Sequence, residues 1–328
     1  MDVVLMKFAL IAYAIGAVVL FIYFFSREDW LRNFGATLAV AGCAAQFAQL
    51  AARYQETHIW PLLNLYGSLS LFSAMSVAIF IFFAFRYRLW FAGGLLLAIA
   101  AIFLAYGITW DEGVMPPVPS LQSYWAKIHV PLVVSSYGAF LVAFVFSIIY
   151  LVKDYGERRF AKRRIVTSTA SGGAAEATLP GVPLSKFDPA PETFAAESAA
   201  SLRDTPALAA AAEGGDVVAG WFATLPSLAQ LDVLVYRAVA IGLPLLTLGI
   251  VTGAAWAHEA WGRYWQWDPK ETAALTSWIV YAAYMHLHTR NAWRGLRCSW
   301  LNVLGFFVIL FTYLGVNIWI SGLHSYKA

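Results

Sequence analysis

Cysteine and charge are scarce in this sequence. Only two cysteines occur among 328 residues, Cys43 and Cys298, so a disulfide framework and a C-x-x-C redox pair are both excluded. No phosphate-binding glycine loop, no Ser/His/Asp arrangement and no paired carboxylates within an apolar run are present, which argues against an ATP-driven pump and a hydrolase. Charged residues make up 12% of the chain, about half of their usual share in a soluble domain.

Long apolar runs dominate the chain instead. Hydrophobic residues make up 60% of it, and the mean hydropathy is +0.65. A transmembrane helix needs about 17 to 25 mostly apolar residues. We therefore predict an all-α polytopic membrane protein with about eight transmembrane helices. The predicted spans are residues 4–25, 35–52, 66–85, 89–107, 130–152, 238–257, 271–290 and 299–321.

The basic residues predict the orientation of these spans. If the first span begins outside, six of the 22 lysines and arginines fall on the outer side and the other sixteen on the inner side. The positive-inside rule then places both termini and the loop around residue 265 in the periplasm. The net charge of +3 is explained by this topology, and we expect no nucleic-acid partner.

The composition divides the chain into four parts. Residues 1–152 form a membrane domain with spans one to five, and the Ala-, Ser-, Gly- and Pro-rich residues 153–220 form a flexible cytoplasmic linker. Residues 221–237 regain apolar residues at mixed helical spacing and predict an interfacial helix. Residues 238–328 form spans six to eight and include a periplasmic Trp-rich loop, residues 256–272.

The segment WGRYWQWDPKET, residues 261–272, combines an aromatic platform with a helix start. Its tryptophans include Trp261, Trp265 and Trp267. Single indole rings often lie at a membrane surface, but several on one short loop favour a flat platform for a large planar ligand. Asp268 followed by Pro269 and Glu271 is typical of a helix N-terminus with a capping box, so we expect a helix to begin at Asp268.

Two histidines are predicted at the level of this loop. His129 opens the fifth span, and His324 follows the eighth. Two neutral imidazoles on opposite faces of a porphyrin would make a six-coordinate haem, whereas a solvated, hydrogen-bonded side chain is the alternative for each histidine. The other four histidines are His58, His258, His286 and His288.

His286 lies at a different depth. It follows Thr272 by 14 residues, or roughly 21 Å along a helix, which places it toward the inner leaflet. An ionisable group inside a span is costly and marks a functional candidate, and at this depth it cannot share a metal with His129. We expect His288, about 200° around the helix, to face the membrane interface, and His58 and His258 to lie on the surface.

These features together resemble the CcsA (ResC) family of system II cytochrome c biogenesis, whose haem-handling proteins carry a Trp-rich "WWD" segment. The resemblance covers all eight spans, with His258, Ala273 and Gly67 as departures. The matching segments are PLLNLYGSL (61–69), KIHV with SSYGAF (127–140), LDVLVYR (231–237), WGRYWQWDPKET (261–272), YMH (284–286) and SGLHSY (321–326).

The resemblance implies a role for each matching residue. His129 and His324 would ligate haem iron at the periplasmic face, and His286 would ligate it within the bilayer. Contact with the haem would come from Trp261, Trp265, Trp267 and Asp268. No well-placed second ligand for His286 occurs in this sequence, so it would come from a CcsB-type membrane protein.

The function implied by the resemblance is to bind haem b and present it to the CxxCH motifs of apocytochrome c, as a subunit of a holocytochrome c synthase. Further partners would be thiol-reducing thioredoxin-like proteins. The Ala-rich linker favours a bacterial inner membrane over a thylakoid membrane. A b-type electron-transfer subunit of a respiratory complex and a solute transporter with an outer Trp gate are the alternatives.

Overall fold

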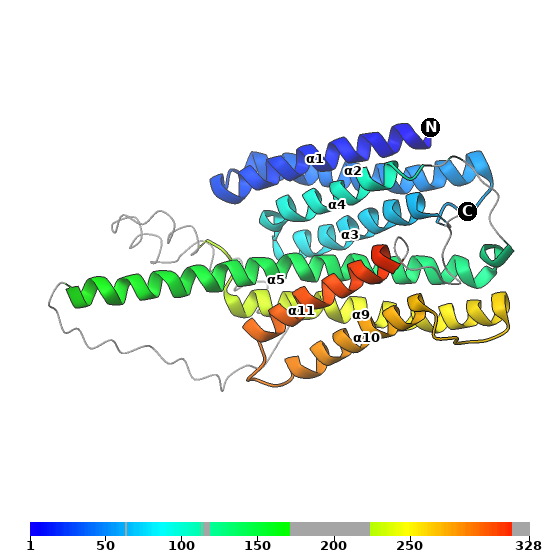
Figure 1. Cartoon of the computed structure of the whole chain (residues 1–328). Coiled ribbons are helices and arrows are strands. Elements are labelled where there is room, and N and C mark those ends of the chain that lie inside the picture. The colour runs from blue at the N-terminus through cyan, green and yellow to red at the C-terminus, as the bar shows by residue number, and fades with distance from the viewer. Residues whose placement is uncertain (63, 112, 114–118, 171–223, 317–328) are drawn as a thin grey trace.

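The fold is a bundle of long helices. The computed structural model describes residues 1–62, 64–111, 113, 119–170 and 224–316, without the side chains of 160–170. Within these ranges all regular elements are helical, which confirms the predicted all-α class (Figure 1). The α-helices are α1 (Asp2–Ser26), α2 (Asp29–Thr57), α3 (Leu65–Tyr87), α4 (Gly93–Ile108), α5 (Tyr124–Ala170), α9 (Leu228–Trp261), α10 (Pro269–His288) and α11 (Leu296–Leu310).

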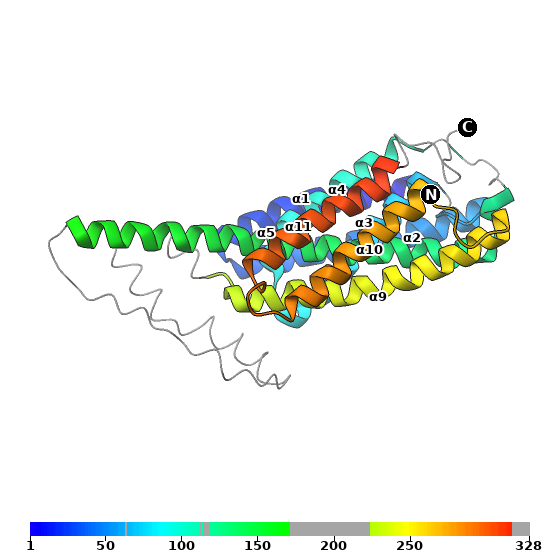
Figure 2. The ribbon, with the colours of Figure 1, turned by 60° about the horizontal axis from the view of Figure 1, so that its bottom comes forward.

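Each predicted span overlaps one of these helices, and residues 317–321 of the last span lie outside the described residues. Seven stretches of the described chain are long and apolar enough to cross a membrane, and the protein is a multi-pass membrane protein. The exception is α10, whose 20 residues include Lys270, Glu271, His286 and His288. It runs between α9 and α11, as Figure 2 shows.

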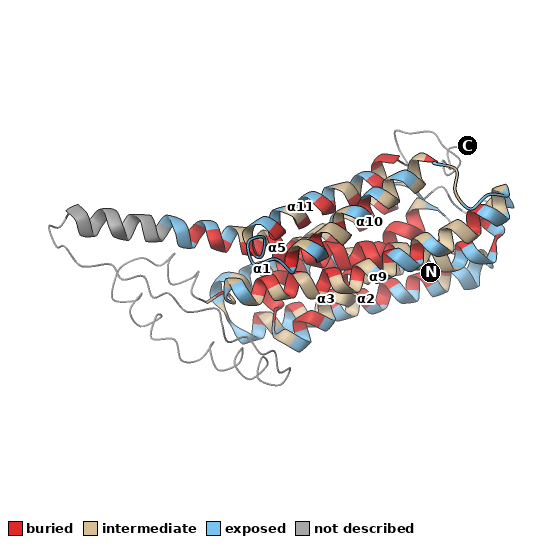
Figure 3. Ribbon diagram, turned by 90° about the horizontal axis from the view of Figure 1, so that it is seen from below, coloured by how far each residue is buried: buried red, intermediate tan, exposed pale blue. Residues whose placement is uncertain are grey.

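The helices form two groups that meet at α5. The group α1 to α4 packs on one side of α5, mainly through α3, and α9 to α11 pack on the other (Figure 1). Buried residues gather in the middle of the bundle (Figure 3). Met1 and residues 262–268 lie at the same end, here called the loop end, while Leu228 and Ala170 mark the linker end (Figure 1). Which end faces the periplasm stays a prediction.

Three glycines allow α9 to approach α5 closely. A Cβ atom at Gly242 would lie 2.6 Å from the Phe140 ring, and one at Gly249 would lie 2.5 Å from Val133. A Cβ atom at Gly253 would lie 2.7 Å from the ring of His129. Small residues at helix interfaces are how membrane helices gain van der Waals contact without a hydrophobic driving force between them.

Helix boundaries differ from the predicted domain boundaries at two places. Helix α5 continues to Ala170, so the predicted flexible linker begins as helix over 153–170. The helix is long because nothing breaks its hydrogen bonding in KDYGERRFAKRR, which has no proline and one glycine. Helix α9 is continuous from Leu228, so 228–237 of the predicted interfacial helix are its first turns; Ser227 and Gln230 form its capping box. Residues 171–223 lie outside the described residues.

A buried charge cluster ties α1, α2 and the residues after α4 together at the loop end. Arg53 of α2 is 7% exposed, and its guanidinium lies 2.8 Å from the Asp2 carboxylate and 3.2 Å from that of Asp111. It also donates to the Gly113 carbonyl and lies over the Tyr66 ring, 4.2 Å from its centroid. A buried charge is stable only when it is paired and hydrogen-bonded in this way.

Arg53→Met should therefore destabilise the protein strongly. The variant leaves two carboxylates without their shared cation, and removing one partner of a buried pair costs about 3–5 kcal/mol. Thermal unfolding of the solubilised protein measures the effect. Arg32→Met is the control, because the Arg32–Asp29 pair is exposed and should be worth less than about 1 kcal/mol. Equal effects of the two substitutions would refute the structural importance of the cluster.

Candidate functional site

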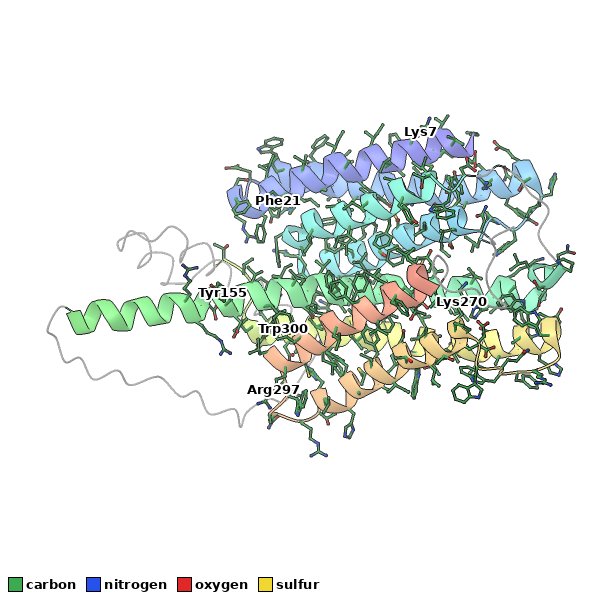
Figure 4. All side chains as sticks on the ribbon, viewed as in Figure 1. Lys7, Phe21, Tyr155, Lys270, Arg297 and Trp300 are labelled. Atoms are coloured by element: carbon green, nitrogen blue, oxygen red, sulfur yellow. The ribbon has the colours of Figure 1, made fainter. Side chains whose placement is uncertain are left out.

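The loop between α9 and α10 is held by the predicted capping box. The Asp268 side chain accepts from the Lys270 backbone N–H at 3.1 Å, Pro269 is the first helical residue, and the Glu271 carboxylate accepts from the Gln266 and Asp268 N–H groups at 2.8 and 3.3 Å. The helix start at Asp268 is confirmed. Asp268 is buried, and its carboxylate caps the first turn of α10, where Figure 4 shows Lys270.

Two of the predicted aromatic residues stand together on the loop. The rings of Trp265 and Trp267 meet edge to face at 5.7 Å, and Trp267 is 70% exposed. Trp267 has φ of 58°, a conformation that is strained for a bulky residue and that tends to occur at functional sites. The buried Trp265 Nε1–H has no hydrogen-bond partner among the described residues. The loop therefore presents the exposed indole of Trp267, with the Trp265 ring packed against it.

His129 is held by a backbone carbonyl of the neighbouring helix. It lies in the second turn of α5, half-buried, and its Nδ1 is 2.7 Å from the Gly249 carbonyl oxygen of α9. A carbonyl oxygen only accepts hydrogen bonds, so Nδ1 carries the hydrogen. In the neutral ring the lone pair is then on Nε2, the arrangement in which metal-binding histidines are usually oriented.

Two further tryptophans join His129 to the start of the loop. The ring of Trp256 lies 5.7 Å from that of His129 and 5.3 Å from that of Trp261, and its Nε1 donates to the Ser120 carbonyl at 2.7 Å. Trp256 is buried against Leu121 and Ala126. The sequence prediction assigns no role to Trp256, although it is one of two tryptophans among the alanines of the run AAWAHEAW.

The predicted outer residues thus fall into two groups. Trp261 belongs with His129 and Trp256, whereas Trp265 and Trp267 form a second pair above the α10 start. His324 lies outside the described residues, as do residues 317–328 as a whole. His258 is exposed and stacks on Tyr264 at 4.2 Å, in agreement with its predicted surface position.

The two histidines at the end of α10 lie on opposite faces. His286 is exposed, and its side chain points away from the bundle. His288 is 5% exposed, and its Nε2 is 2.9 Å from the Asp232 carboxylate. The expectation that His288 faces the membrane interface is wrong, because Asp232 of α9 offers it a buried acceptor. Within the described ranges, no three His, Cys, Asp or Glu residues cluster as a protein-only metal site.

A family model and several known proteins that resemble this chain all belong to cytochrome c assembly. A family model described as "Cytochrome C assembly protein" matches residues 62–324. Proteins called cytochrome c biogenesis protein CcsA are similar to this chain: that of Heterosigma akashiwo is 32% identical over 93% of this chain and 89% of its own length, and that of Gloeobacter violaceus is 34% identical over 92% and 88%. That of Microcystis aeruginosa is 36% identical over 90% and 88%.

A solved structure shares the fold. The cytochrome c heme lyase CcmF matches with a TM-score of 0.58 and 15% identity, over 95% of this chain and 46% of CcmF. This chain therefore spans about half the length of that protein, and the likeness concerns the helix arrangement alone.

The His129 tautomer can be tested directly. In protein labelled with 15N-histidine, the nitrogen shifts of His129 should identify Nδ1 as the protonated nitrogen. Gly253→Ala should disturb this state, because the new Cβ would lie 2.7 Å from the ring and push Nδ1 from the Gly249 carbonyl. Gly242→Ala is the matched control, with a similar overlap against Phe140 on the same helix. A His129 spectrum protonated on Nε2 alone would disprove the assignment.

Proposed function

The chain belongs to the cytochrome c assembly protein family, and from this premise we propose that it acts in cytochrome c biogenesis by holding haem b for attachment to apocytochrome c. It would bind haem at two depths, inside the membrane and at the periplasmic face. The attachment would take place at the periplasmic face, on the CxxCH motif of the apocytochrome.

The observation that carries this proposal is the orientation of His129. The Gly249 carbonyl fixes the hydrogen on Nδ1, so in the neutral ring Nε2 is the nitrogen that would bind an iron ion. A partly buried imidazole with a fixed tautomer loses little entropy on coordination. His324 is the proposed second ligand at this site, on the basis of its sequence position and the family resemblance.

The tryptophans would support the flat face of the porphyrin. Trp267 offers an exposed indole, and the Trp265 ring packs edge to face against it. Trp256 contacts both His129 and Trp261, and so connects the proposed iron ligand His129 to the loop. Asp268 and Glu271 keep the loop in one conformation through the capping box. These residues therefore offer haem an imidazole, indole rings and a loop held in one conformation.

The chain's contribution to the reaction would be positioning. Haem supplies the two vinyl groups to which the apocytochrome cysteine thiols add. His129, His324 and the tryptophans hold the iron and the ring edge in one orientation, and fixed orientation alone accelerates such a step strongly. The histidine of the CxxCH motif would replace one of the two chain ligands as the product leaves.

His286 is proposed as the ligand within the membrane. Its imidazole is exposed on α10, so a second protein can reach it from outside the bundle. A CcsB-type membrane protein would provide the opposite axial ligand. Because this chain has no C-x-x-C pair, separate thioredoxin-like proteins would keep the apocytochrome thiols reduced. The proposed location is a bacterial inner membrane, with the loop end in the periplasm.

His129→Gly tests the periplasmic site. The variant, purified with its partner, should bind haem at this site at least about tenfold more weakly, and a co-expressed cytochrome c should lose its covalent haem. Added imidazole should restore part of both, because it can fill the space that the side chain leaves. Haem absorption spectra and haem staining of the cytochrome measure the two effects.

His258→Gly is the control for this experiment, since His258 is an exposed histidine at the same end of the bundle. It should keep both the spectrum and the cytochrome. A His129→Gly variant with full haem content and normal cytochrome assembly would refute the proposed site. Haem binding without covalent attachment in the unmodified protein would favour an electron-transfer subunit instead, and a colourless protein would favour a transporter.

A further inference from the structure

The Asp232 carboxylate of α9 holds the end of α10 and the start of α11 at the linker end. One oxygen of Asp232, in α9, lies 2.9 Å from His288 Nε2, in the last turn of α10. The other oxygen accepts from the Gly295 N–H at 3.0 Å, at the N-terminus of α11. Asp232 and His288 are 9% and 5% exposed. Asp232 therefore fixes both ends of the connection between α10 and α11; Figure 4 shows Arg297 just beyond it.

The His288 ring is held by several contacts in this arrangement. A carboxylate accepts hydrogen bonds, so His288 donates from Nε2. The ring stacks on Tyr236 at 4.6 Å and lies 5.9 Å from Tyr284. Its backbone carbonyl accepts from Arg294 Nε at 2.9 Å. Because Nε2, the ring and the carbonyl contact the protein and the residue is buried, His288 is well suited to hold the helix.

The rotation of α10 follows from this contact. Successive residues in an α-helix are 100° apart, so residues 286 and 288 differ by about 200°. When Asp232 holds His288 toward the bundle, His286 has to point away from it, as observed. The last turn of a helix otherwise frays, because its carbonyl groups lack helical partners. Here Thr289 Oγ1 donates to the His286 carbonyl at 2.7 Å and completes the turn.

We propose that Asp232 and His288 are positioning residues for His286, and that their contact keeps the His286 imidazole on the outward face at one depth and in one rotation. The inference rests on the proposed function of His286 as a haem ligand. It gives a physical role to Asp232 in the segment LDVLVYR, which the haem sites themselves do not use. Neither Asp232 nor His288 touches the haem in this proposal.

Asp232→Leu in the full chain, purified with its partner subunit, tests the inference. The variant removes both hydrogen bonds, so the last turn of α10 loses its anchor. The haem held by His286 should bind roughly tenfold more weakly, the low end of the loss seen when a residue that orients a metal ligand is removed. Its low-spin absorption bands should weaken, and added imidazole should restore them, because an external ligand replaces a misplaced one without refolding the protein.

Two other variants make the result specific. Asp232→Asn has nearly the same volume and keeps one oxygen acceptor, so it should accumulate normally and show part of the loss. Asn302→Leu is the control for a buried polar group in the same half of the bundle: Asn302 of α11 donates to Ser147 of α5 at 2.9 Å. It should leave the haem bands unchanged.

The outcomes separate the inference from the function on which it rests. His286→Ala with a full membrane-haem spectrum would overturn the function of His286 and this inference with it. If His286→Ala loses that haem while Asp232→Leu and Asp232→Asn keep it, the inference alone is wrong. A loss in Asp232→Leu that imidazole does not restore, or an equal loss in Asn302→Leu, would also overturn it, since both indicate general damage to the bundle.

Discussion

The close packing of α5 against α9 is the constraint on which the other features depend. Gly242, Gly249 and Gly253 remove the side chains that would keep the helices apart, and the helices meet at near-backbone distance. Only at this distance can a histidine of one helix reach a main-chain carbonyl of the other, as His129 does with Gly249. The same interface brings Trp256 against His129 and so connects the loop end to the helix pair. A larger residue at Gly253 would displace the His129 ring from this interface although the histidine itself is unchanged.

At each end of the bundle, a hydrogen-bond acceptor on α9 fixes the orientation of a histidine ring. An imidazole has two nitrogens and can rotate, so it is a defined ligand or a defined anchor only when an acceptor fixes its hydrogen. At the loop end the acceptor is a neutral carbonyl, at Gly249, and the ring remains suited to coordination. At the linker end the acceptor is the Asp232 carboxylate, which hydrogen-bonds to His288. The nearby His286 then points away from the bundle. The two acceptors belong to one helix, α9.

Much of this architecture can be predicted from the sequence. Most of the features that cannot be predicted depend on contacts between distant residues. Apolar length predicts the helices, and Asp268 with Glu271 predicts the start of α10, because these signals are local. Periodicity gives the angle between His286 and His288 but not which of them faces the bundle, since that depends on Asp232, 56 residues away. The hydrogen bond from His129 to a main-chain oxygen cannot be predicted from the sequence, because every residue has a main-chain carbonyl. The unbroken run of α5 past residue 153 was hidden by composition that resembles a linker.

The length of α5 has a consequence for how the two halves of the chain are joined. At 1.5 Å per residue its 47 residues extend about 70 Å, more than twice the hydrocarbon thickness of a bilayer. The covalent connection from α5 to α9 therefore departs at Ala170, far from the packed interface that holds these helices together. A division of the polypeptide between residues 171 and 223 would therefore leave every described helix–helix contact in place.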